Sequence, residues 1–169
     1  SKNKITMYRF QEIKNQPDLR KNIEAAMKIR AWMREWFASQ GFLEVETPTL
    51  SRAPGQEPYL NPFEVTVRDE RNQETPGYLV TSPEYALKKL LVAGYSKIFE
   101  LSRAFRNNEP TGGSHNPVFT MLEWYRTGTD YRGIMDDTEH LVSFVYQNLQ
   151  TTNCKLQTKI DFSAPWERL

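Results

Sequence analysis

Cysteine is nearly absent from this sequence: Cys154 is the only one among 169 residues. A single thiol cannot form an intrachain disulfide or a thiolate cage around a metal, which favours the reducing cytoplasm. The apolar runs fall far short of the ~20 residues that a membrane helix needs, and residues 1–4 lack the apolar segment of a signal peptide. We therefore expect a soluble intracellular protein with no membrane partner and no bound structural metal.

The sequence also lacks an excess of charge of either sign. Lys and Arg number 22 against 21 Asp and Glu, a formal net charge of +1, which argues against a general polyanion-binding surface. No repeat with a period of ~20 to 50 residues and no low-complexity tract is present, which excludes solenoids and disordered arrays. With 38% hydrophobic residues, a chain of this length can bury one core, so the composition predicts one globular domain.

Hydrophobic spacing predicts alternating helices and strands. Apolar residues at helical spacing predict three helices, over 18–39, over 83–93 and after Asp130. Gly41 would end the first helix. Ser82 would be the N-cap of the second, with Pro83 at its first helical position. Alternation and turn residues predict strands over 42–46, 63–67, 78–80, 97–106, 118–126 and 156–162. The second and third strands would form a hairpin with a long connection over 69–77.

Polar residues gather on two of these predicted strands. Side chains alternate between the faces of a strand, so Glu100 and Arg106 share one face of 97–106. By the same rule Phe119, Glu123 and Tyr125 share one face of 118–126. If the two strands pair, an acidic group, a basic group and aromatic rings lie together on the sheet.

The residues around the connecting loop resemble a known family. Phe105-Arg106-Asn107, His115-Asn116-Pro117 and the run from Phe119 to Arg126 (Phe-Thr-Met-Leu-Glu-Trp-Tyr-Arg) strongly resemble motif 2 of class II aminoacyl-tRNA synthetases of the lysine branch. The helix followed by Gly41, Phe42, Val45 and Pro48 resembles motif 1, and residues 81–85 (Thr-Ser-Pro-Glu-Tyr) resemble the amino-acid-binding stretch between the motifs. The resemblance covers residues 23–168.

This resemblance implies the fold class and the domain organisation. It implies an α+β class II catalytic core, an antiparallel β-sheet flanked by helices, whose C-terminal part, including motif 3, is missing from the chain. Residues 1–17 are then an N-terminal extension and residues 18–169 the N-terminal portion of the catalytic domain. We expect such a fragment to be inactive alone.

Within the lysine branch, the sequences of residues 81–85, 90–94 and 121–126 most resemble those of the elongation factor P lysine ligases. Those relatives of lysyl-tRNA synthetase lack the anticodon-binding barrel, and only about twenty residues precede the first long helix here, too few for such a barrel. The leading hypothesis is ATP-dependent activation of lysine or a lysine isomer as the adenylate and its transfer to a lysine of elongation factor P. The alternatives are a lysyl-tRNA synthetase fragment that charges tRNA and a non-catalytic synthetase-like binding module.

The resemblance also implies an ATP site. Arg106 would be the catalytic residue, because its planar fork of donors can hold the substrate carboxylate and the α-phosphate together. Phe119 would stack against adenine and His115 would lie near the γ-phosphate. The full set of ATP-binding residues implied is Arg106, Asn107, Asn108, Glu109, His115, Asn116 and Phe119. Mg²⁺ is expected with ATP, with ligands in the part that the chain lacks.

The amino-acid pocket implied by the resemblance contains two carboxylates. Glu84 would bind the amino group nearest the reacting end, Glu123 would also lie in the pocket, and Tyr125 would close over the methylene chain or bind the distal amine. With Ser82 and Pro83 these residues complete the predicted pocket, which suits lysine or β-lysine. Simpler roles remain open: Arg106 paired with Glu100, Phe119 in the core, and Glu84 stabilising a helix N-terminus.

Two further features bear on association and on nucleotide binding. Pro48 resembles the dimer-interface proline of motif 1, and Trp32 and Trp36 offer apolar area, so we expect a homodimer. The family usually has Phe-Arg-Asn-Glu, whereas this chain inserts a residue, which leaves the adenine-contacting position open between Asn108 and Glu109. Val118 also replaces a usual glutamate, so we expect weaker nucleotide binding.

Overall fold

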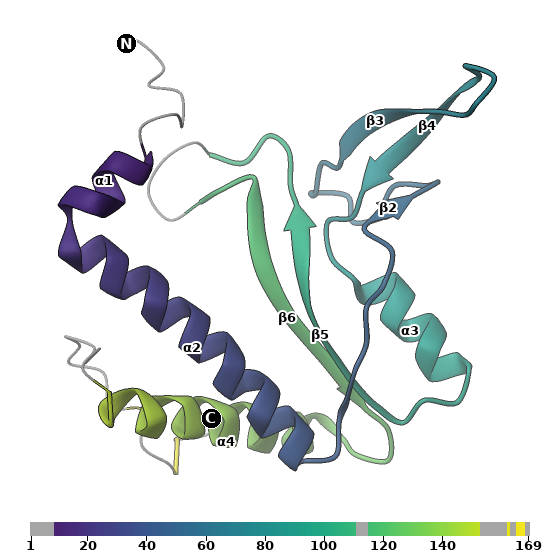
Figure 1. Cartoon of the computed structure of the whole chain (residues 1–169). Coiled ribbons are helices and arrows are strands. Elements are labelled where there is room, and N and C mark those ends of the chain that lie inside the picture. Colours follow the sequence, from purple (N-terminus) through teal and green to yellow (C-terminus); the bar gives the residue numbers. More distant parts are fainter. Residues whose placement is uncertain (1–8, 111–114, 153–161, 163–164, 168–169) are drawn as a thin grey trace. The chain divides into compact units, whose positions relative to one another are not determined.

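The computed structural model describes residues 9–110, 115–152, 162 and 165–167 (Figure 1). The chain divides into two compact units. The helical unit combines residues up to 40 with residues from 129 onward, and the sheet unit consists of residues 41–128. The predicted strand over 156–162 and Cys154 lie outside the described residues, apart from residue 162 itself.

The helical unit contains α1 (Arg9–Asn15), α2 (Pro17–Ser39) and α4 (Tyr131–Gln150). Proline at the first position of α2 has a backbone angle that suits a helix start. The carboxylate of Asp130 caps α4 by accepting hydrogen bonds from the backbone N–H groups of Arg132 (2.9 Å) and Gly133 (3.4 Å). In Figure 1, α4 crosses α2 near the C-terminal end of α2. Both long helices confirm the predictions from hydrophobic spacing.

Aromatic and aliphatic side chains form the apolar core of the helical unit. Phe37 and Leu149 are almost fully buried, and the ring of Trp36 meets that of Phe37 edge-on with centroids 4.9 Å apart. Trp36 is only 5% exposed. The prediction that Trp36 offers apolar area to a second copy is therefore wrong, because this side chain is already packed within its own chain.

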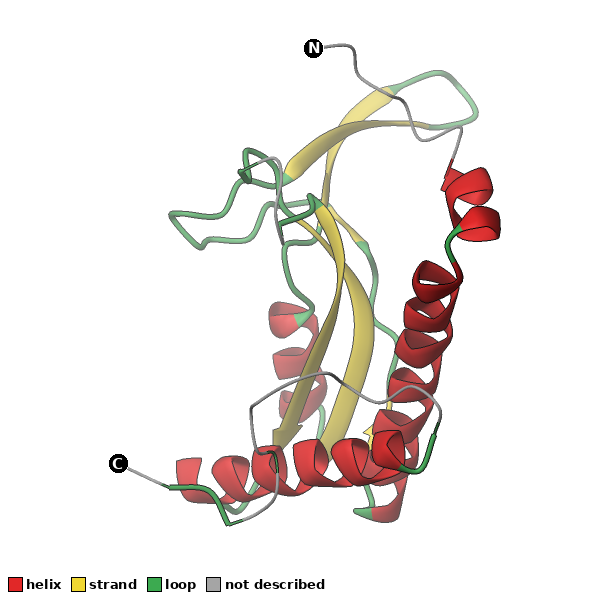
Figure 2. Cartoon of the chain, turned by 90° about the vertical axis from the view of Figure 1, so that its left-hand side faces the viewer, coloured by secondary structure: helices red, strands yellow, loops and turns green. Residues whose placement is uncertain are grey.

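The first sheet of the sheet unit has the strand order β1-β5-β6. β5 (Lys97–Phe105) and β6 (Val118–Arg126) are long antiparallel partners, seen as the two twisted yellow strands of Figure 2. β1 (Leu43–Glu44) pairs with β5 in parallel and is shorter than the predicted strand 42–46. The ladder stops after Val45, whose N–H donates to the carbonyl of Phe99 (2.9 Å), because Pro48 soon follows and has no N–H to donate.

The second sheet has the order β2-β4-β3 and is antiparallel throughout. It consists of β2 (Leu50–Ser51), β3 (Phe63–Arg68) and β4 (Glu74–Leu79). β4 begins earlier than predicted, so residues 74–77 of the predicted connection 69–77 belong to a strand. A strand can contain Pro76 here because β2 pairs only with Tyr78 and Leu79, which leaves the other side of Pro76 open.

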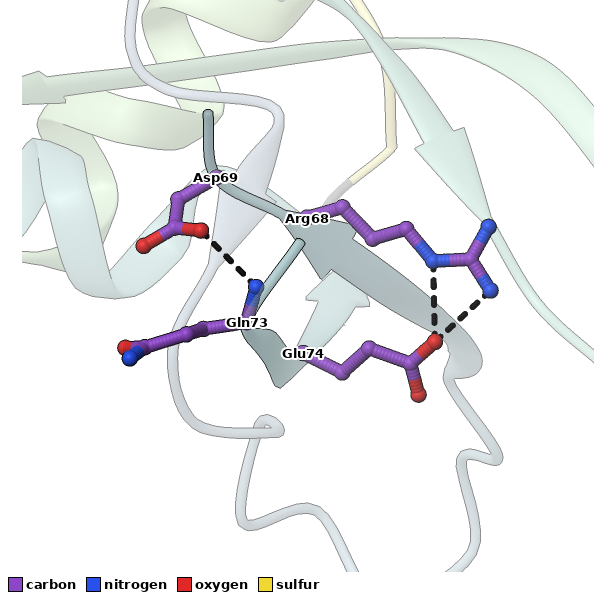
Figure 3. Close-up of polar contacts among 4 residues, drawn as sticks. All are labelled: Arg68, Asp69, Gln73 and Glu74. Atoms are coloured by element: carbon purple, nitrogen blue, oxygen red, sulfur yellow. Dashed lines mark hydrogen bonds and ion pairs between the residues drawn. The ribbon is translucent and has the colours of Figure 1, made fainter. Parts of the chain in front are cut away.

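A short turn replaces the long predicted connection between β3 and β4. Asp69 Oδ1 accepts hydrogen bonds from the backbone N–H groups of Arg71 (2.9 Å) and Gln73 (2.8 Å), and Asn72 adopts a positive φ of 59°. Beside the turn, the guanidinium of Arg68 binds the carboxylate of Glu74 on the opposite strand (Figure 3). The aspartate turn therefore closes the hairpin within five residues, 69–73.

α3 (Glu84–Val92) follows β4 and lies beside β5 and β6 in both views (Figures 1 and 2). The prediction that Ser82 caps this helix is wrong. The carbonyl of Pro83 accepts from the N–H groups of Ala86 and Leu87, both at 3.0 Å, so Pro83 is itself the capping position. Proline has no side-chain acceptor, and the helix start carries no side-chain cap. Across the described residues, no helix combines the length and apolar character that crossing a bilayer requires.

Candidate functional site

The register of β5 and β6 places the predicted site residues on one face of the first sheet. Glu100 is opposite Glu123, Ala104 is opposite Phe119, and residues two apart share a face. Arg106 continues the same alternation, since its backbone N–H donates to the carbonyl of Pro117 (2.9 Å) just beyond the ladder. The expectation that Arg106, Phe119, Glu123 and Tyr125 share a face is confirmed.

The guanidinium of Arg106 is held by two contacts. It lies over the ring of Phe119, with the guanidinium carbon 5.2 Å from the ring centroid. Its Nε donates to the carbonyl of Thr81 at 3.4 Å. The alternative of a pair with Glu100 is not what the structure shows, because the carboxylate of Glu100 binds Thr47 instead. Both contacts of Arg106 use Nε and the flat face of the group, so the terminal amino groups can hold anions.

An acidic cluster lies further along the same face. The hydroxyl of Tyr125 donates to Glu123 Oε1 at 2.8 Å. Partial burial raises the pKa of Glu123, and the charges of Glu84 and Glu100 raise it further, whereas the Tyr125 hydrogen bond and the charge of Lys88 oppose the rise. Burial and the bond to Glu123 raise the pKa of Tyr125, so the phenol keeps the proton that it donates. Glu84 and Glu123 therefore act on one another although they come from separate elements.

Lys88 belongs to this cluster and was not predicted. Its ammonium pairs with the carboxylate of Glu84 one turn earlier on α3, and this contact raises the pKa of Lys88. The spacing of four residues on a predicted helix is the signal in the sequence that could have indicated the pair. Glu84 is thus paired with Lys88 of the same chain, whereas the resemblance implies that Glu84 binds an ammonium group of the substrate.

The loop after β5 carries most of the remaining predicted ATP-binding residues. The N–H of Asn107 donates to the carbonyl of Asn61 (2.7 Å), and Asn108 adopts a positive φ of 58°. His115 Nδ1 lies 3.7 Å from Glu109 Oε2. Asn116 is exposed, and residues 111–114 lie outside the described part. The structure therefore brings Glu109, and not Asn108, beside His115.

A cavity of about 690 Å³ lies beside the start of α3. One wall is the segment 48–56 and another is formed by residues 78–83 with Tyr85, Ala86 and Lys89. Ser82 and Pro83 line this cavity, whereas Glu84, Glu123 and Arg106 are not among its lining residues. The predicted amino-acid residues are thus divided between the cavity and the acidic cluster. The wall 48–56 was not predicted, because only Pro48 among its residues belongs to a recognised motif and that motif indicates a dimer interface.

Metal-ligating side chains are not gathered at any point of the part of the chain that the structure describes. Among those residues, no group of three or more His, Cys, Asp or Glu side chains could hold a metal ion.

Comparisons with known proteins match the chain over nearly its whole length. A lysine–tRNA ligase of Haemophilus influenzae is 39% identical over 163 residues, which cover 95% of this chain and 32% of that protein. A lysine–tRNA ligase of Magnetococcus marinus is 38% identical over 155 residues, 90% of this chain and 30% of that protein. An elongation factor P–(R)-β-lysine ligase of Salmonella paratyphi B is 39% identical over 148 residues, 87% of this chain and 43% of that protein.

The chain therefore spans about a third to two fifths of the length of these relatives. The family profile described as tRNA synthetases class II (D, K and N) matches residues 1–169. The α+β fold, with antiparallel strand pairs and flanking helices, is that of a partial catalytic core of this kind. The chain belongs to the class II tRNA synthetase family, in the group that contains the D, K and N enzymes.

Proposed function

We propose that the protein containing this chain activates a diamino acid, lysine or β-lysine, with ATP to form an aminoacyl-adenylate in the cytoplasm. The observation that carries the proposal is the arrangement along one sheet face. The guanidinium of Arg106 lies over the ring of Phe119 at one end, and the acidic group formed by Glu123 and Tyr125 lies further along. Such a face can hold a molecule with anionic groups at one end and an ammonium group at the other.

The chemistry requires alignment more than proton transfer. A carboxylate oxygen of the amino acid attacks the α-phosphorus of ATP, the bond to the β-phosphate oxygen breaks, and pyrophosphate leaves. Arg106 would hold the carboxylate and an α-phosphate oxygen together through its terminal amino groups. Phe119 would support adenine by stacking, and His115 would lie near the γ-phosphate. Mg²⁺ would accompany ATP, and we assign no ligand for it among the described residues.

Selection of a diamino acid would come from two carboxylates. Glu84 would bind the amino group nearest the reacting end, with Ser82 and Pro83 beside it, and Glu123 with Tyr125 would face the other ammonium. An unpaired buried carboxylate is costly, so a neutral side chain at Glu123 should be disfavoured. Lysine and β-lysine carry the same charges and satisfy both groups.

We propose a lysine side chain of elongation factor P as the acceptor. Residues 81–85 and 121–126, which resemble the lysine ligases of elongation factor P, support this choice, as does the Salmonella paratyphi B relative. tRNA is the second candidate, supported by the equally similar lysine–tRNA ligases. A non-catalytic binding module is the third candidate, because Val118 is exposed where the family usually has a glutamate. The absence of amino-acid activation would support that candidate.

Pyrophosphate exchange with the full-length protein tests the proposal. We expect exchange with lysine or β-lysine to exceed exchange with leucine by about 100-fold or more, because leucine leaves a carboxylate without a partner. Equal rates for lysine and leucine would refute the assignment of the pocket, and no exchange with any amino acid would favour the binding module. Transfer of labelled lysine to elongation factor P or to tRNA then identifies the acceptor.

We also propose a homodimer formed through the motif 1 region. Pro48 is exposed and Trp32 is only half-buried, so both can contribute to an interface, although Trp36 cannot. Light scattering at tens of micromolar protein should give twice the mass of one chain. A strict monomer would contradict this proposal.

A further inference from the structure

Glu100 is a buried acidic residue in the middle of β5. Glu100 is only 4% exposed, and both of its carboxylate oxygens accept hydrogen bonds from Thr47. The backbone N–H of Thr47 donates to Oε1 at 3.1 Å, and the hydroxyl donates to Oε2 at 2.8 Å. A carboxylate this deeply buried is costly unless it is well hydrogen-bonded. These two hydrogen bonds therefore indicate a role beyond filling space.

Thr47 lies where the chain leaves the first sheet. Val45 makes the last backbone hydrogen bond to β5, and the N–H of Thr47 is the last donor before Pro48. Glu100 therefore fixes the point from which the segment 48–56 departs. That segment forms one wall of the cavity, and its next backbone bond joins the carbonyl of Thr49 to the N–H of Val80 at 3.0 Å.

Glu100 also faces the acidic cluster. It is the direct cross-strand partner of Glu123, and its charge is one of the causes that raise the pKa of Glu123. The other groups that act on Glu123 are Tyr125 on the same strand and Glu84 and Lys88 from α3. One buried carboxylate is thus hydrogen-bonded to Thr47, the residue that precedes the cavity wall, and its charge acts on Glu123 of the acidic cluster.

We propose that Glu100 is a positioning residue, which clamps Thr47 and so fixes the point at which the cavity wall 48–56 leaves the first sheet. The part of this inference that concerns substrate rests on the proposed function, because Glu123 is there assigned to the amino acid. The clamp itself does not depend on that assignment.

Two substitutions separate the clamp from the charge. In Glu100→Gln, the amide oxygen can accept from the Thr47 N–H and the amide N–H can donate to the Thr47 hydroxyl oxygen, so the clamp remains while the charge is lost. In Thr47→Val, the hydroxyl contact is lost while the charge of Glu100 remains. Glu64→Gln, on exposed β3, is the matched control for removing a strand glutamate.

Hydrogen–deuterium exchange tests the clamp without any ligand. Loss of one buried hydrogen bond should speed amide exchange in residues 48–56 of Thr47→Val by about fivefold, with α3 unchanged. Glu100→Gln and Glu64→Gln should leave this segment as in the wild type. Unchanged exchange of 48–56 in Thr47→Val would overturn the clamp.

The pH dependence of the KM for lysine tests the effect of the charge. Binding needs ionised Glu123, so the KM should rise as the pH falls through the pKa of this group. Removal of the like charge in Glu100→Gln should lower that pKa and move the midpoint to lower pH, with kcat at high pH little changed. An unmoved midpoint would overturn this part of the inference. If the wild type shows no pyrophosphate exchange, the proposed function is refuted. The hydrogen–deuterium exchange of residues 48–56 then still decides whether the clamp exists.

Discussion

Arg106→Lys should slow amino-acid activation by about 100-fold or more, the cost of removing one well-placed donor from a charged reaction centre. The ammonium of lysine is compact and cannot hold a carboxylate and a phosphate oxygen side by side in one plane. It would also lose the flat contact with Phe119 and the Nε bond to Thr81. Steady-state pyrophosphate exchange with the full-length protein measures the change, and the larger effect should be in kcat.

The chain offers a matched control for this substitution. Arg103 lies on β5, three residues before Arg106 and on the opposite face, where it is paired in register with Thr120 and is exposed. Arg103→Lys should leave the rate near that of the wild type. Similar losses in both variants, or none in Arg106→Lys, would show that Arg106 is not the residue that aligns the two anions.

Glu123→Gln should reduce kcat/KM for lysine by about 10- to 100-fold and relax the selection of amino acids. The amide keeps an oxygen that can accept from the Tyr125 hydroxyl, so the local geometry can survive. It no longer attracts an ammonium group, and a charge-assisted hydrogen bond contributes about 1.5–3 kcal/mol. A neutral side chain such as that of leucine would no longer face an unpaired carboxylate, so its relative rate should rise.

The ratio of the exchange rates for lysine and leucine is the deciding measurement for Glu123. Glu64→Gln on β3 provides the control, and its ratio should equal that of the wild type. If Glu123→Gln preserves the ratio, the acidic cluster does not select the substrate, and Glu123 has a structural role in the sheet.

Periodicity predicted the elements whose pattern is long. α2, β5 and β6 agree with the predicted spans within one residue, and α4 begins directly after Asp130 as predicted, because each buries one regular face. The boundaries of β1 and β4 were wrong, since they depend on where a partner strand ends, and partners are not visible in the local sequence. The N-cap of α3 is Pro83 and not Ser82 for a similar reason. The carbonyl that accepts the first helical hydrogen bond depends on the direction in which the preceding chain enters the helix.

The candidate site was predictable to the extent that it follows strand alternation. The shared face of Arg106 and Glu123 follows from a period of two, whereas the contact between Glu100 and Thr47 joins residues far apart in the chain and has no local signal. The cavity wall 48–56 was missed on the same ground. Its position is set by the pairing of β2 with β4 and by the bonds of the preceding Thr47 to Glu100 on β5, which only the folded chain reveals.

The division of the helical unit between the two ends of the sequence affects the order in which the chain can fold during synthesis. α2 is translated before the sheet unit, and the helix that it packs against, α4, emerges only after residues 40–130 have been made. The sheet unit is continuous in sequence and can close in the interval. The apolar residues of α2 are consequently exposed to solvent until α4 has been synthesised. Exposed apolar surface on a nascent chain promotes aggregation, which chaperones prevent.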